Sequence, residues 1–167
     1  EMCIRDSHSA TGSGTFEHLT AGPTTLLDPT GEGTVGSAVK DSAIVAAARA
    51  AGIPVETVPQ LVAIAGDSNS KAQTEAKTIL RERAVVLGEA VSSLVGLFNP
   101  TRVVLGGQAF TDYPDTLNLI ASLIHQNSTD VDIRVTAARG RVQQQAAAAV
   151  AITAVAYDPL HAVEGAR

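Results

Sequence analysis

The chain is poor in residues on which several kinds of function depend. Aromatic side chains make up only 3% of the residues and tryptophan is absent, which argues against a stacking platform for single-stranded nucleic acid. The single cysteine excludes an internal disulfide and a cysteine-rich zinc site. Lysine and arginine number 12 against 17 acidic residues, for a net charge of −5. No basic stripe is present that would neutralise nucleic-acid phosphates.

Long apolar runs and a secretory signal are also missing. The longest apolar stretch, residues 145–157, is too short and too rich in alanine for a transmembrane helix. The first residues do not show the charged and then apolar pattern of a signal peptide. We therefore expect a soluble cytoplasmic protein without membrane contact. With 167 residues, 45% of them hydrophobic, the chain can bury the core of one domain.

The first seven residues, EMCIRDS, resemble a translated sequencing adapter. On this interpretation residues 1–7 are foreign to the natural protein, and the remainder is the C-terminal piece of a longer one. We then expect residues 8–160 to form an incomplete C-terminal lobe and residues 161–167 to form a tail. The alternative is an unusual but natural N-terminus.

Local signals predict several elements in the first half of the chain. Residues 15–27 are mildly helical, and residues 28–36, with one proline and three glycines, predict a loop. Residues 41–51 predict an alanine-rich helix that ends at Gly52. The pattern TVPQ at residues 57–60 is typical of a capping box and predicts a further short helix.

The strongest signal is a long helix of about 28 residues, or eight turns, which begins at a second capping-box pattern, SKAQ, at residues 70–73. Apolar residues recur along it in steps of four and three, which places one continuous stripe on one face. Charged side chains, Arg83 among them, are expected on the rest of its circumference. Asn99 and Pro100 end the helix. The stripe consists of Ala76, Leu80, Ala84, Leu87, Val91, Leu94 and Phe98.

Two short strands are predicted in the second half. The β-branched run at residues 102–105 predicts a buried strand, and the alternation at residues 131–135 predicts a second one. Helices are expected at residues 112–124 and 142–157. The order of helices and strands indicates an α/β fold with a parallel sheet. Because two strands do not make a stable sheet alone, further strands are expected outside this sequence.

The turn after the first predicted strand is the clearest candidate for ligand binding. Ligands of parallel α/β sheets collect at the carboxyl ends of strands, and Gly106 and Gly107 would let the backbone approach a ligand closely. A simple tight turn is the alternative. No serine–histidine–aspartate set, paired catalytic carboxylates or phosphate loop is recognisable, so we expect no catalytic residue in this chain.

Two segments resemble the C-terminal signature of the ROK family of bacterial repressors, uncharacterised reading frames and sugar kinases. They are LGEAV at residues 87–91 and LFNPTRVVLGG at residues 97–107. The resemblance covers roughly residues 14–157. It implies the C-terminal part of a lobe of the actin-like, ribonuclease H-like ATPase fold, rich in helices and with few remaining strands.

The resemblance also implies binding residues. Family kinases line the adenosine side of their nucleotide cleft with the Gly-Gly turn, so Gly106, Gly107 and Gln108 would face a nucleotide. Gln108 stands where the family often has a third glycine. Glu17 matches a family glutamate that accepts hydrogen bonds from sugar hydroxyls, a task that suits a carboxylate. A glutamate at the start of a helix is the alternative for Glu17.

A zinc motif of the family is degenerate in this chain. Without gaps, its three cysteine positions fall on His8, Ala10 and Thr15. Since a closed structural zinc site needs about four nitrogen or sulfur ligands, the resemblance predicts that the zinc site is lost and that no metal is bound.

Three functions remain open from the sequence. The first is a ROK-type transcriptional regulator, in which this chain is the sugar-sensing lobe and DNA is bound through an N-terminal domain outside it. The second is an ATP- and magnesium-dependent hexose kinase of the glucokinase or N-acetylmannosamine kinase type. The third is a family member with neither activity. The family resemblance further implies a sugar or sugar-phosphate ligand and a homodimer.

Overall fold

The computed structural model describes most of the chain between Glu17 and Thr136. The expected helix at residues 142–157 lies outside this part. The described residues are 17–22, 24, 26–29, 33–127 and 130–136. The elements are α1 (Val35–Val39), α2 (Asp41–Ala50), α3 (Val58–Gly66), α4 (Gln73–Phe98), β1 (Arg102–Leu105), α5 (Gln108–Thr111), the 3₁₀ helix η1 (Pro114–Thr116), α6 (Leu117–His125) and β2 (Asp132–Val135).

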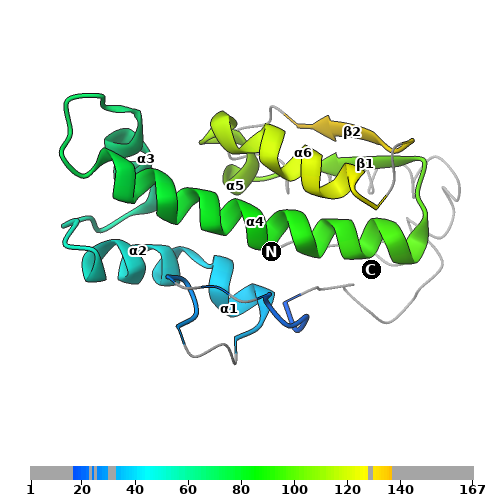
Figure 1. The fold of residues 1–167 in the computed structure, drawn as a ribbon, viewed down its shortest axis with the longest axis horizontal. Coiled ribbons are helices and arrows are strands. Elements are labelled where there is room, and N and C mark those ends of the chain that lie inside the picture. Colours follow the sequence, from blue (N-terminus) through cyan, green and yellow to red (C-terminus); the bar gives the residue numbers. More distant parts are fainter. Residues whose placement is uncertain (1–16, 23, 25, 30–32, 128–129, 137–167) are drawn as a thin grey trace, which may run out of the picture.

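The long helix α4 organises the described part of the molecule (Figure 1). Helices α1 and α2 lie along one side of it, whereas α6 and the two strands lie on the other side (Figure 1). The helix α3 packs near its N-terminal end. The strands β1 and β2 pair in parallel, with Val103 opposite Ile133 and Leu105 opposite Val135. The expected helix-rich α/β arrangement with a small parallel sheet is therefore confirmed.

The core of the described part forms two clusters on either side of α4. The first joins α1, α2 and α3 to the N-terminal half of α4, with Ile44, Leu61 and Ile79 fully buried. The second joins α6 and β1 to the later turns of α4, with Ile120 and Ile124 fully buried. The long helix thus contributes residues to both clusters. Its buried surface is therefore wider than the single apolar stripe predicted from the sequence.

The predicted apolar stripe on α4 is confirmed as far as Val91 and fails at the end of the helix. Leu94 is only half-buried, and the side chain of Phe98 is 62% exposed. The reason is that α1 and α2 cover only the earlier turns on their side of α4 (Figure 1). Val95, in contrast, is buried in the second cluster.

One of the two predicted capping boxes is confirmed and the other is wrong. At the start of α3 the Thr57 N–H donates to the side-chain oxygen of Gln60 at 3.2 Å, as the pattern requires. At the start of α4 the Ser70 hydroxyl instead accepts from the Ala72 N–H at 3.3 Å. This local turn uses up the serine side chain, so α4 begins later, at Gln73, without a side-chain cap.

Both predicted helix ends after α2 and α4 are confirmed by left-handed backbone. Gly52 follows α2 with a φ of 78°. Asn99 ends α4 with a φ of 43°, and its N–H donates to the Val95 carbonyl at 2.8 Å. Glycine and asparagine tolerate this conformation better than other residues, which is why the sequence marks these ends so clearly.

The N-terminal segment differs most from the sequence expectation. The described part of residues 15–27 is not helical, and Thr20 pairs with Thr34 in an isolated antiparallel bridge. The expected loop at residues 28–36 already contains the start of α1. The Val35 N–H donates to the Leu19 carbonyl at 2.7 Å, and the Gly36 N–H donates to the Glu17 carbonyl at 3.0 Å. The segment satisfies the free amides at the start of α1, and a pattern of side chains cannot show such backbone pairing.

Two glycines of α4 allow a direct test of how tightly α4 and α6 pack. A Cβ added at Gly88 would lie 2.6 Å from the Cδ1 atom and 3.3 Å from the Cβ atom of Leu123, whereas one added at Gly96 would meet nothing within 4 Å. Overpacking costs about 1–3 kcal/mol, and alanine recovers up to about 1 kcal/mol of helix propensity. We expect Gly88→Ala to lower the free energy of unfolding by about 1 kcal/mol in urea denaturation and Gly96→Ala to raise it slightly. Equal effects of the two substitutions would contradict close α4–α6 packing.

Candidate functional site: a cleft beside the Gly-Gly turn

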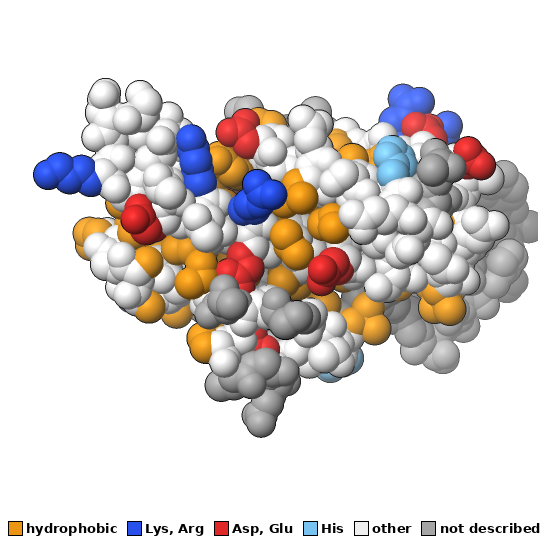
Figure 2. Space-filling view, viewed as in Figure 1, with side chains coloured by type: hydrophobic (Ala, Val, Ile, Leu, Met, Phe, Trp, Pro, Cys, Tyr) orange, Lys and Arg blue, Asp and Glu red, His pale blue; other side chains and the backbone are white. Residues whose placement is uncertain are grey.

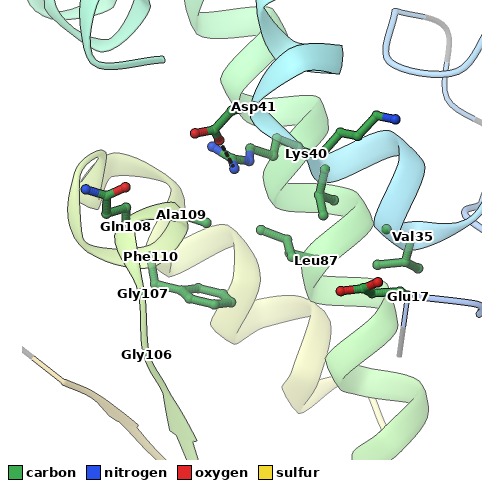
Figure 3. A pocket seen from close by; sticks show the side chains of 13 residues that line it. Glu17, Val35, Lys40, Asp41, Leu87, Gly106, Gly107, Gln108, Ala109 and Phe110 are labelled. Atoms are coloured by element: carbon green, nitrogen blue, oxygen red, sulfur yellow. Dashed lines mark hydrogen bonds and ion pairs between the residues drawn. The ribbon is translucent and has the colours of Figure 1, made fainter. Parts of the chain in front are cut away.

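A cleft of about 420 Å³ lies between α1, the start of α2 and the turn that joins β1 to α5 (Figure 3). Its volume is in the range of sites for small ligands. Leu87 contributes to it from α4 and Phe110 from α5. Its described lining is completed by Glu17, Val35, Gly36, Val39, Lys40, Asp41, Arg83, Gly106, Gly107, Gln108 and Ala109.

The cleft brings together the two groups of site residues expected from the sequence. Glu17 and the turn Gly106–Gln108 are about 90 positions apart in the chain, yet both line this cavity. Of the three turn residues, Gly107 has a φ of 109°, and a Cβ added there would meet nothing within 4 Å. The Gln108 side chain is exposed and points away from Glu17 (Figure 3).

Glu17 is held through its backbone and leaves its carboxylate free for a ligand. Its carbonyl accepts from the Gly36 N–H. A Cβ added at Gly36 would lie 2.7 Å from the Glu17 Cβ, so the missing side chain allows this close approach. The exposed Glu17 carboxylate makes no hydrogen bond or ion pair with any residue in the described part of the chain. Because Glu17 belongs to a turn, the alternative of a helix-start glutamate is wrong.

An ion pair at the edge of the cleft was not foreseen from the sequence. Arg83 Nη2 lies 2.9 Å from Asp41 Oδ1, and the dashed line at Asp41 in Figure 3 marks this contact. The Arg83 side chain is only 13% exposed, whereas that of Asp41 is 67% exposed. Burial lowers the pKa of Arg83, against the attraction of Asp41. The helical pattern places Arg83 off the apolar stripe. Its burial and its contact with Asp41 of α2 arise from tertiary packing.

The polar part of the cleft lining consists mainly of charged side chains. Its described polar side chains are carboxylates, cations and one amide, with no histidine, cysteine, serine or tyrosine. Within the described residues no group of three or more potential metal ligands comes together. The degenerate zinc positions His8, Ala10 and Thr15 lie outside this part, so the loss of zinc stays a prediction. No helix in the described part is long and apolar enough to cross a membrane.

Positive and negative side chains are interspersed on the face of the molecule shown in Figure 2. On the face shown in Figure 2, lysine and arginine side chains alternate with acidic ones over the helices and do not form a continuous basic area. At the sheet, Arg102 and Arg134 both pair with Asp132, at 2.8 and 3.0 Å. Their hydrogen bonds lower the pKa of Asp132 and partly neutralise the two cations.

The fold of the described part is similar to that of a bacterial protein of known structure. No protein-family model matches the sequence. A crystal structure described as a ROK family transcriptional regulator, a homologue of the E. coli MLC protein, superposes with a TM-score of 0.56. It is 22% identical and covers 73% of this chain, which spans 34% of that one. The chain has the fold of a ROK family regulator, and the resemblance stated from the sequence motifs is confirmed at that level.

Curated relatives agree with this structural similarity. The transcriptional regulator Rv0485 of Mycobacterium tuberculosis and the transcriptional regulator Mb0495 of Mycobacterium bovis are each 38% identical to the chain over 147 residues. The match covers 80% of this chain and 33% of each relative. The chain is thus similar to transcriptional regulators over most of its length, and it spans a third of the length of these relatives.

Proposed function

We propose that the chain is the sugar-sensing lobe of a bacterial transcriptional regulator of the ROK type. The observation that carries the proposal is the shared cleft, in which Glu17 and the Gly106–Gln108 turn face one cavity. The names of the relatives favour a regulator over a kinase. In this proposal the protein is cytoplasmic and dimeric, and DNA is bound through a part that lies outside this sequence.

The sensing role depends on the chemistry of the cleft. Glu17 offers a charged acceptor to sugar hydroxyls, and such charge-assisted hydrogen bonds are stronger than neutral ones. The apolar side chains of Val35, Leu87 and Phe110 offer contacts to the C–H surface of a sugar ring. A bound sugar would contact α1, α4 and the β1–α5 turn at the same time. Sugar binding would therefore stabilise the relative positions of these elements in which all three contacts form.

The experiment uses the full reading frame that contains this chain. We expect calorimetric titration with hexoses and N-acetylhexosamines to identify a sugar that binds. We also expect that sugar to change the affinity for DNA upstream of the gene in a gel-shift assay. A coupled assay for ADP formation is the control for the kinase alternative. Sugar-dependent turnover of ATP without DNA binding would contradict the regulator and support the kinase.

A further inference from the structure

The Arg83 side chain is the polar group of the cleft that the proposed function leaves unexplained. It comes from α4 and reaches the cavity that Glu17 and the β1–α5 turn also line. Its single ion pair in the described part of the structure joins one terminal nitrogen to one oxygen of Asp41. The Nε atom is buried and has no hydrogen-bond partner among the described residues. A guanidinium presents five N–H donors in a planar fork, and the donor on the buried Nε is unmatched by any described residue.

A buried cation with unused donors is costly unless an anion completes its environment. Asp41 does so only in part, because its carboxylate is mostly exposed. Asp112 attracts the cation as well but forms no ion pair with it among the described residues. Asp41 also begins α2, where the helix dipole stabilises a negative charge independently of Arg83. An incoming anion could therefore take over or share the guanidinium without leaving Asp41 destabilised.

We propose that Arg83 recognises a negatively charged group on the sugar ligand, such as the phosphate of a sugar phosphate or the carboxylate of a sugar acid. The guanidinium fork matches both groups in two-point geometry. Glu17 would then bind the hydroxyls and Arg83 the anionic end of one ligand in the same cleft. This inference rests on the proposed sugar site and assigns Arg83 as the residue that recognises an anionic group of the ligand.

The test measures binding to the full reading frame that contains this chain by calorimetry, with four probes. These are glucose, glucose 6-phosphate, glucuronate and inorganic phosphate. We expect at least one of the two anionic sugars to bind at least ten times more tightly than glucose. Arg83→Met keeps much of the apolar stem of the arginine side chain and removes the charge. The preference for the anionic sugar over glucose should therefore fall to less than twofold. The affinity for glucose should change little.

Two further substitutions separate recognition from a structural role. Asp41→Asn removes the competing carboxylate and should tighten binding of the anionic sugar severalfold. Arg81→Met removes an exposed cation two positions away on α4, outside the cleft lining, and should have no effect on binding. If Arg83 served only to join α2 to α4, Arg83→Met and Asp41→Asn would both lower the melting temperature and leave the preference unchanged. That result would overturn the inference.

The probes also distinguish this inference from the proposed function. Binding of glucose without any preference for the anionic sugars overturns the role of Arg83 and leaves the sugar site intact. Binding of inorganic phosphate as tightly as the anionic sugars overturns a sugar-specific role. Binding of none of the probes, nor of any sugar in the wider panel, contradicts the sugar site itself.

Discussion

Replacing Glu17 with alanine is expected to weaken sugar binding by about 10- to 150-fold. The carboxylate lines the cleft without a partner in the described structure, so a bound sugar would find it free to accept hydrogen bonds from ring hydroxyls. Hydrogen bonds to charged groups contribute about 1.5–3 kcal/mol, which corresponds to this range of affinity. Because the carboxylate makes no hydrogen bond or ion pair with any of the described residues, the melting temperature should stay the same. Calorimetric titration of the wild type and the variant measures the effect.

Two matched variants test the geometry behind this expectation. His18→Ala changes the exposed neighbour of Glu17, which is not part of the cleft lining, and should leave the affinity unchanged. Gly36→Ala keeps the carboxylate but pushes against the Glu17 side chain, so it should weaken binding as well. If a sugar binds the wild type and Glu17→Ala equally well, Glu17 is not the sugar-binding residue.

The largest loss of stability is expected from Ile120→Ala. Ile120 lies on α6 at 0% exposure, within the cluster that joins α6 to α4 and β1. Truncation of a buried isoleucine to alanine removes apolar contacts and leaves a cavity, which costs about 2–5 kcal/mol. Urea denaturation followed by circular dichroism measures this loss. Asn118→Ala, on an exposed position of the same helix, should stay within about 0.5 kcal/mol of the wild type.

Ile120→Ala also tests whether the core supports the cleft. Phe110 belongs to the same buried cluster as Ile120 and contributes to the lining of the cleft. A loosened cluster should therefore allow the β1–α5 turn to move and should lower the affinity for a sugar moderately. An unchanged melting curve of Ile120→Ala would contradict the packing of α6 on α4.

The cleft could be predicted from the sequence only in part. The Gly-Gly turn followed from its position after an apolar strand, and Glu17 followed from a family motif. Neither signal indicates that the two lie in one cavity, because about 90 residues of chain separate them. Arg83 carries no motif at all. Its proposed role follows from its burial beside Asp41, a residue that is 42 positions away and on another helix.

The sequence by itself determined the elements that depend on local chemistry. The long helix follows from its apolar spacing, its end follows from Asn99 and Pro100, and the strand β1 follows from a run of β-branched residues. Only the tertiary structure decided where the segment at Glu17 lies, where α1 begins and that Arg83 on α4 is buried. These features depend on backbone hydrogen bonds and packing between distant segments. A pattern of neighbouring side chains contains no information about such long-range pairing.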